Sequence, residues 1–179
     1  MDKDEMKRRA AAAINAAAAE LEALARDIER EPELGFKEKK TAAKVEKYLT
    51  ALGLSPETGL ALTGVKARAR SGQAGPTVAV LSELDAVGTP DSPKADPLTG
   101  AAHTCGHFLQ MTTMLAAAEG LLKSGILPEL SGDVVFFAVP AEEYVEIEYR
   151  RRLMGEGKLH YLCGKDELIY EGHFDDIDM

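Results

Sequence analysis

Two histidines and a cysteine stand within five residues in the stretch AAHTCGHFLQ, at His103, Cys105 and His107. The glycine between Cys105 and His107 permits a tight backbone turn, which would aim a thiolate and an imidazole at the same point. An apolar segment follows directly. The stretch is therefore open to three interpretations: a metal site, a thiol nucleophile, or the polar start of a buried helix.

Two pairs of carboxylates stand at the ends of apolar segments that are typical of buried strands. Glu83 and Asp85 lie in SELDAV, and Glu142 and Glu143 lie in PAEE. In open α/β sheets, ligand sites lie beyond the carboxyl ends of the strands. We therefore expect these carboxylates to converge with the cysteine–histidine stretch.

A metal site would use one residue of each kind. Zinc prefers thiolate, imidazole and carboxylate ligands, and Cys105, His107 and one glutamate of the pair at 142 and 143 would supply all three. The other glutamate would point in a different direction and take a proton from a water bound to the metal. That arrangement is the working part of a metal-dependent hydrolase.

Two other interpretations stay open at the level of the residues alone. Cys105 could be a nucleophile with His103 or His107 as its base, although no third group that would orient the base is evident. Alternatively, Cys105 is a small residue buried at a helix start, and the paired glutamates complement the dipole of a following helix. No CxxC or HExxH pattern decides between them.

Alternating helices and short buried strands would position these groups. Residues 4–30, 37–53 and 105–125 have the apolar spacing or composition of helices, and Leu109 is among the positions expected to be buried. TGVKARAR predicts a strand, TVAVLSEL an inner strand, DVVFFAVP a second buried strand, and residues 141–158 a polar helix. This order predicts an α/β sandwich whose strands are at least partly parallel.

Composition limits the classes of function. The chain has 179 residues, 45% of them apolar, and a net charge of −9. The negative net charge argues against a nucleic-acid partner, because binding to phosphates requires clustered Lys and Arg. No apolar run approaches the ~20 residues that span a bilayer, and the first 30 residues lack the pattern of a secretory signal. We therefore expect a cytoplasmic protein with no nucleic-acid or membrane partner, whose two cysteines, Cys105 and Cys163, are reduced.

Five segments follow one another in a characteristic order: EPELGFKEKKTAAKV, ELDAV, HTCGH, VPAEE and GKDELIYEGHFDDIDM. In this order they resemble the amidohydrolase branch of the dinuclear zinc metallopeptidases, which includes aminoacylases, N-acyl amino acid amidohydrolases and aminobenzoyl-glutamate hydrolases. The segment after AEE is most similar to the aminobenzoyl-glutamate hydrolase-like members. The resemblance implies a three-layer α/β sandwich with a mostly parallel central sheet, a small-molecule amide as substrate, and Zn²⁺ or Mn²⁺ as cofactor, two ions in a complete enzyme.

The resemblance also assigns roles to individual residues. Cys105 matches the family's bridging thiolate, His107 its histidine ligand and Glu143 its carboxylate ligand, while Glu142 matches the general base. Asp85 matches the acidic residue behind the metals, where it is expected to orient a histidine ligand through the ring nitrogen that faces away from the metal.

Other positions match less closely. His103 corresponds to a family histidine near the metals, without an assigned role, whereas His160 and His173 match no ligand position and are expected on the surface. Phe108 stands where Asp or Asn is common after CGH, and Cys163 stands where glycine is usual.

Members of this family are much longer and carry a lid and dimerisation domain and a late histidine ligand. The resemblance therefore implies that residues 1–179 are the N-terminal portion of a catalytic domain, without the lid and dimerisation domain and the C-terminal part, that binds at most one metal ion. A sheet with an uncovered edge predicts a homo-oligomer. We expect a metal-dependent amidohydrolase, inactive or incomplete in this form; the alternative is a non-catalytic metal-binding or association domain that retains the fold.

Overall fold

The computed structural model describes residues 1–179 and contains five α-helices, one short 3-10 helix and six strands. The helices are α1 (Lys3–Arg30), α2 (Lys39–Ala51), α3 (His107–Lys123), η1 (Leu127–Glu129), α4 (Ile147–Gly155) and α5 (Gly164–Tyr170). The strands are β1 (Glu57–Leu60), β2 (Gly64–Ala69), β3 (Thr77–Glu83), β4 (Val87–Gly88), β5 (Ala101–Ala102) and β6 (Asp133–Val139).

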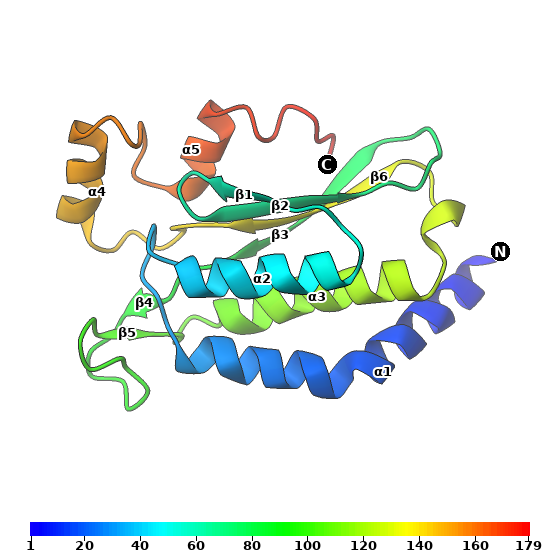
Figure 1. Ribbon diagram of the computed structural model, residues 1–179, viewed down its shortest axis with the longest axis horizontal. Coiled ribbons are helices and arrows are strands. Elements are labelled where there is room, and N and C mark those ends of the chain that lie inside the picture. Colours follow the sequence, from blue (N-terminus) through cyan, green and yellow to red (C-terminus); the bar gives the residue numbers. More distant parts are fainter.

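Four strands form a central sheet in the order β1-β2-β6-β3, and β4 and β5 form a separate two-stranded pair. The sheet is mixed, because β3 is parallel to β6 whereas β2 is antiparallel to both β1 and β6. Helices α1, α2 and α3 lie on one side of the sheet and α5 on the other (Figure 1). The α/β class and layered architecture expected from the sequence are thus confirmed.

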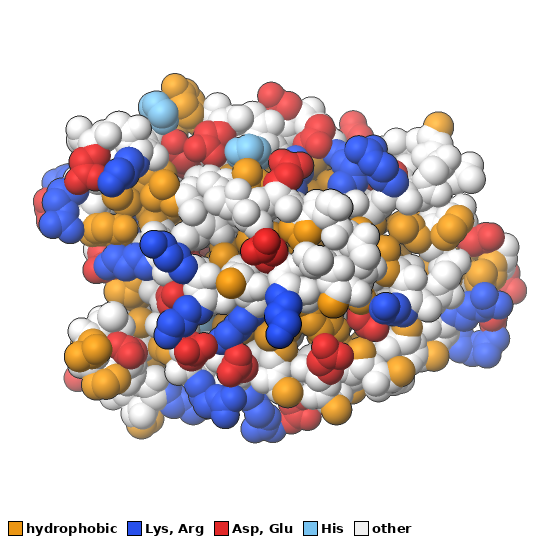
Figure 2. Space-filling model, viewed as in Figure 1, with side chains coloured by type: hydrophobic (Ala, Val, Ile, Leu, Met, Phe, Trp, Pro, Cys, Tyr) orange, Lys and Arg blue, Asp and Glu red, His pale blue; other side chains and the backbone are white.

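Two apolar cores lie against the two faces of β6, because successive side chains of a strand point to opposite faces. Phe136 packs with the helices of the first layer, where Ile28 of α1 and Leu115 of α3 are fully buried. Phe137 packs on the other face with Leu168 of α5. Acidic and basic side chains are interspersed over the face of the molecule that carries α1 and α2 (Figure 2).

The expectation that TVAVLSEL is an inner strand is wrong. This segment forms β3 at the edge of the sheet, and Val78 and Leu81 are 36% and 39% exposed. The inner positions belong to β6 and β2, and the basic residues Lys66 and Arg68 of β2 are paired with Asp176 at 2.6 and 2.5 Å. An apolar run in the sequence shows neither how far the faces of a strand are covered nor whether a neighbouring strand lies along both of its edges.

Two further expectations need correction. The polar helix predicted over residues 141–158 begins only at Ile147, since Ala141 and Glu146 have left-handed backbone angles, with φ of 50° at both residues. Residues 141–146 therefore form a loop, and Glu142 and Glu143 are not a helix start. The expectation that Leu109 is buried in the third helix is also wrong, because this residue lies on the outer face of α3 and is 56% exposed.

Both cysteines are free, which confirms the expectation that they are not bridged to each other. None of the helices combines the length and the apolar character that a membrane crossing requires.

Candidate metal centre

Three loops meet where the parallel strands β3 and β6 end. The first follows β3 and carries Asp85, the second leads into α3, and the third follows β6 and carries Glu142 and Glu143. The backbone N–H of Leu84 donates to the carbonyl of Val139 at 2.9 Å, which joins the start of the first loop to the end of β6. The parallel pairing therefore brings the carboxylate pairs to one edge of the sheet, as the sequence predicts.

Cys105, His107 and Glu143 converge there, and their potential ligand atoms all lie within 4.8 Å of one another. Gly106, between the first two, has a φ of 97°, a backbone conformation that residues with a side chain rarely adopt. This turn places the cysteine before the start of α3 and the histidine on its first residue. One thiol, one imidazole and one carboxylate within this distance fit the donor preferences of zinc and similar divalent cations.

His107 is oriented by the loop that follows β3. Its Nδ1 lies 2.8 Å from the backbone oxygen of Asp85 and 3.3 Å from Oδ1 of the same residue. Because the carbonyl oxygen can only accept, Nδ1 carries the hydrogen, and Nε2 is left to face outward. Nε2 lies 3.8 Å from Oε2 of Glu142 and 3.9 Å from Oε2 of Glu83, so it points into a group of carboxylates.

These charges determine the protonation of the ring when no metal is bound. Burial acts to lower the pKa of His107, but the hydrogen bonds and negative charge of Asp85, together with the charge of Glu83, outweigh it and raise the pKa to about 9. Without a metal ion, the positively charged ring of His107 therefore interacts with the carboxylates that would otherwise attract a metal cation.

Asp85 links two of the proposed ligands. It is completely buried, and its Oδ2 accepts the backbone N–H of Glu143 at 2.9 Å while its other oxygen faces His107. This carboxylate therefore holds the ring of one ligand and the backbone of another. The arrangement agrees with the orienting role that the family resemblance implies for Asp85.

The surroundings of the Cys105 thiol affect its pKa in the opposite direction from those of an activated nucleophile. Desolvation, hydrogen bonding to Glu143 and the charge of that carboxylate raise the pKa of Cys105 to about 12. Nucleophilic cysteines depend on a lowered pKa and a cationic neighbour. The environment therefore favours the metal interpretation, because a bound cation would reverse this field and stabilise the thiolate.

The remaining histidines lie outside the donor cluster. His103 is buried at 8% exposure, neither ring nitrogen has a hydrogen-bond partner, and burial followed by the charge of His107 lowers its pKa to about 4. His160 Nδ1 is 3.0 Å from Oε1 of Glu167, and His173 Nε2 is 3.2 Å from Oε2 of Glu171. His103 thus stays neutral near the site, while the other two are engaged elsewhere.

The structure adds Lys165 to this site and pairs it with Glu83, which the sequence placed there without an individual role. Nζ of Lys165, on α5, lies 2.7 Å from Oε1 of Glu83 and 4.0 Å from Oε1 of Glu142. The backbone N–H of Glu83 donates to the side chain of Gln110 at 3.0 Å. Lys165 lies in the segment GKDELI, which the family resemblance had already singled out. Its pairing with Glu83 could not be predicted, because the two residues are 82 positions apart in the chain.

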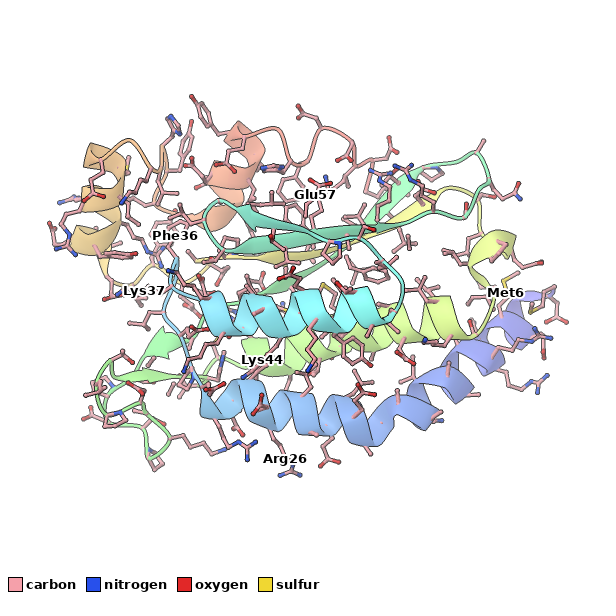
Figure 3. The ribbon with its side chains drawn as sticks, in the orientation of Figure 1. Met6, Arg26, Phe36, Lys37, Lys44 and Glu57 are labelled. Carbon is pink, nitrogen blue, oxygen red and sulfur yellow. The ribbon has the colours of Figure 1, made fainter.

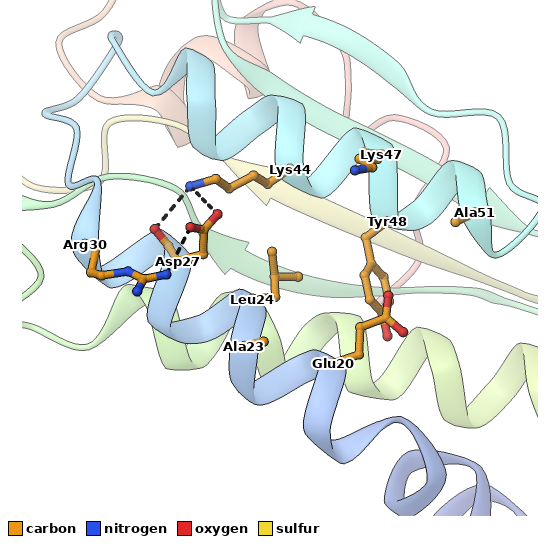
Figure 4. A pocket seen from close by; sticks show the side chains of 9 residues that line it. All are labelled: Glu20, Ala23, Leu24, Asp27, Arg30, Lys44, Lys47, Tyr48 and Ala51. Carbon is orange, nitrogen blue, oxygen red and sulfur yellow. Dashed lines mark hydrogen bonds and ion pairs between the residues drawn. The ribbon is translucent and has the colours of Figure 1, made fainter.

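A groove of about 440 Å³ lies between α1 and α2, and none of its lining residues belongs to the metal centre. Lys44 of α2 reaches across it to Asp27 of α1 at 3.0 Å, and Arg30 also contacts that aspartate (Figure 4). Lys44 is also paired with Glu31 at 2.6 Å. We assign the groove no function.

Comparison with known proteins places this geometry in context. No protein-family model matches the chain. Thermostable carboxypeptidase 2 of Saccharolobus solfataricus is 34% identical over 122 residues, which is 66% of this chain and 30% of that protein. IAA-amino acid hydrolase ILR1-like 5 of Arabidopsis thaliana is 36% identical over 121 residues, 66% of this chain and 27% of that protein. The chain thus spans less than a third of the curated relatives it matches.

A solved structure agrees with these matches. The Bacillus subtilis YXEP protein, described as a dinuclear metal-binding peptidase of the M20 family, superposes with a TM-score of 0.59 and 28% identity. The match covers 88% of this chain and 40% of that protein. The chain is a homologue of amidohydrolases and metallopeptidases. The metal-binding peptidase among the solved structures supports a divalent metal.

Proposed function

We propose that this chain supplies part of the metal centre of an amidohydrolase that acts on an N-acyl amino acid, an aminobenzoyl-glutamate or a dipeptide-like amide. The observation that carries the proposal is the convergence of Cys105, His107 and Glu143 within 4.8 Å, beside the carboxylate of Glu142. The amidohydrolase and peptidase relatives agree with hydrolysis of an amide bond.

Zn²⁺ or Mn²⁺ is the proposed cofactor. When bound, such a metal ion polarises the amide carbonyl and activates the attacking water. Three donors converge, and a closed tetrahedral zinc site uses four, so we expect at most one ion per chain and a position open to water or substrate.

Glu142 is the proposed general base. Its Oε2 lies 3.8 Å from His107 Nε2, and its side chain is 37% exposed, so a water beside the ligand cluster is within its reach. The carboxylate would accept the proton of the attacking water and pass it to the leaving amine. Nζ of Lys165 lies 4.0 Å from Oε1 of Glu142, whereas His107 faces Oε2, the other oxygen of the same carboxylate.

A non-catalytic metal-binding or association role is the second candidate. The observation that favours it is the donor count, because His160 and His173 have other partners and do not extend the cluster. The two candidates share metal binding and differ in turnover.

Metal content and hydrolysis therefore test the proposal in sequence. The chelator-treated protein is dialysed against Zn²⁺ or Mn²⁺, and bound metal is measured by elemental analysis. We expect up to one ion per chain, lost in Cys105→Ala and retained in Cys163→Ala, which changes the other cysteine. A panel of N-acyl amino acids is then offered to the metal-loaded protein. No metal uptake would contradict the amidohydrolase and the metal-binding role and leave only association, and metal uptake without hydrolysis of any amide would favour the non-catalytic candidate.

A further inference from the structure

Arg150, on α4, is a fully buried arginine none of whose hydrogen-bond partners is a carboxylate. Its exposure is 0%, and Nη1 donates to the carbonyl oxygens of Leu162 at 2.7 Å and Ala141 at 3.4 Å, while Nη2 donates to the carbonyl of Glu143. Burial of an ionised guanidinium is costly unless other groups compensate for the lost hydration. Two of the three carbonyls that do so belong to the loop after β6, which carries Glu142 and Glu143.

This loop is held from two sides. On the amide side, Ala141 N donates to Oε1 of Glu38 at 2.8 Å, and Glu143 N donates to Oδ2 of Asp85 at 2.9 Å. On the carbonyl side, both residues are bound by the single guanidinium of Arg150. The loop needs such support, because Ala141 holds a left-handed backbone conformation, which is strained for a residue with a side chain.

The two carbonyls do not depend on Arg150 for a hydrogen bond. Ala141 O also accepts from Gly164 N at 3.2 Å, and Glu143 O also accepts from Val145 N at 2.9 Å. Removal of the guanidinium would therefore leave each of them with a partner. What only Arg150 provides is a rigid link between residues 141 and 143, together with a positive charge behind the glutamate.

The position of the guanidinium is itself fixed by packing. A Cβ added at Gly35 would lie 2.5 Å from Nη2 of Arg150, so the backbone approaches the group as closely as glycine allows. The guanidinium carbon also lies 5.3 Å from the ring centroid of Phe36, on the loop that enters α2 (Figure 3). Planar groups held in this way lose little further freedom on forming hydrogen bonds.

We propose that Arg150 is a positioning residue that holds Glu143 in the orientation in which its carboxylate shares a divalent metal ion with Cys105 and His107. The inference rests on the proposed function, because it requires that these three residues bind metal. Residues that orient metal ligands typically change metal affinity by about 10- to 100-fold when they are replaced.

Co²⁺ titration tests this inference, because the thiolate charge-transfer band reports on Cys105 and the ligand-field bands report on the geometry of the whole ligand set. We compare the wild type with Arg150→Met, Arg150→Lys and the control Arg151→Met. Arg151 is the next residue on α4, its side chain is 66% exposed, and it contacts only Glu148 of the same helix at 3.2 Å. Thermal unfolding followed by circular dichroism establishes that each variant is folded.

We expect Arg150→Met to bind Co²⁺ about 10- to 100-fold more weakly, with shifted ligand-field bands and a retained thiolate band. Arg150→Lys should lie between this variant and the wild type, since one ammonium keeps the charge but lacks the planar fork that spans several carbonyls. Arg151→Met should match the wild type. Combining Arg150→Met with Glu143→Gln should weaken binding no further than Glu143→Gln alone, because both changes act through the same ligand.

Each other outcome is decisive. Folded Arg150 variants with the affinity and bands of the wild type would overturn the inference alone. Additive losses in the double variant, or loss of folding in both Arg150 variants, would assign Arg150 a purely structural role and overturn it as well. A wild-type chain that takes up no Co²⁺ would instead overturn the proposed function and, with it, the inference.

Discussion

Metal binding at this centre should release two protons near neutral pH. The metal-free pKa of His107 is about 9 and that of Cys105 is about 12, so both groups are protonated at about pH 7. The metal requires the neutral imidazole and the thiolate, and binding must therefore displace a proton from each. Because both pKa values are raised, the affinity falls as the pH falls.

The magnitude follows from the number of protons. Between about pH 7 and pH 8, two displaced protons change the apparent metal affinity by about 100-fold for each pH unit. An imidazole with the ordinary pKa of 6.5 would already be neutral, which would leave one proton and a change of about 10-fold. The difference between these slopes is the effect of Asp85 and Glu83 on His107.

Isothermal titration calorimetry with Zn²⁺, in two buffers of different ionisation enthalpy, counts the protons released. We expect about two in the wild type and about one in Asp85→Asn, which replaces the carboxylate whose hydrogen bond and charge raise the pKa of His107. The affinity of Asp85→Asn should also depend less steeply on pH. A wild type that releases about one proton, with the same slope as Asp85→Asn, would refute this account of the electrostatics.

Three further predictions concern the glutamate pair at 142 and 143, the buried carboxylate of Glu38 and the edge strand β3. Glu142→Gln should retain metal and, wherever amide hydrolysis is measurable, lose about 10²- to 10⁴-fold in rate, whereas Glu143→Gln should lose metal; the reverse pattern in elemental analysis and kinetics would exchange the two roles. Burial raises the pKa of Glu38 from 4.5 to about 7, so the unfolding free energy should fall by about 3 kcal/mol as pH rises through that window. Urea unfolding should show this decline in the wild type and not in Glu38→Gln. Equal pH profiles of the two proteins would mean that folding does not raise the pKa of Glu38. The exposed apolar side chains of Val78 and Leu81 on the edge strand β3 should promote association that Leu81→Lys weakens, and light scattering that detects only monomers of the wild type would contradict this.

Features that depend on short segments could be predicted from the amino-acid sequence. The alternation of apolar runs with helical patterns indicated an α/β fold, and the turn at Gly106 between Cys105 and His107 is a local property of three residues. Carboxylates placed directly after two buried strands indicated where the sheet would gather its polar groups. These inferences hold because periodicity and turn chemistry act over a few residues.

The position of β3 at the edge of the sheet, the position of the glutamate pair and the contacts that hold this pair depend on tertiary packing. Residues 141–146 have a composition that suits a helix, but Ala141 N is bound by Glu38, 103 residues earlier in the chain. Glu143 N is bound by Asp85, 58 residues earlier, and Arg150 binds the same loop from α4. Contacts of this range outweigh local preference, because a buried charge must find its partners wherever the packed chain provides them.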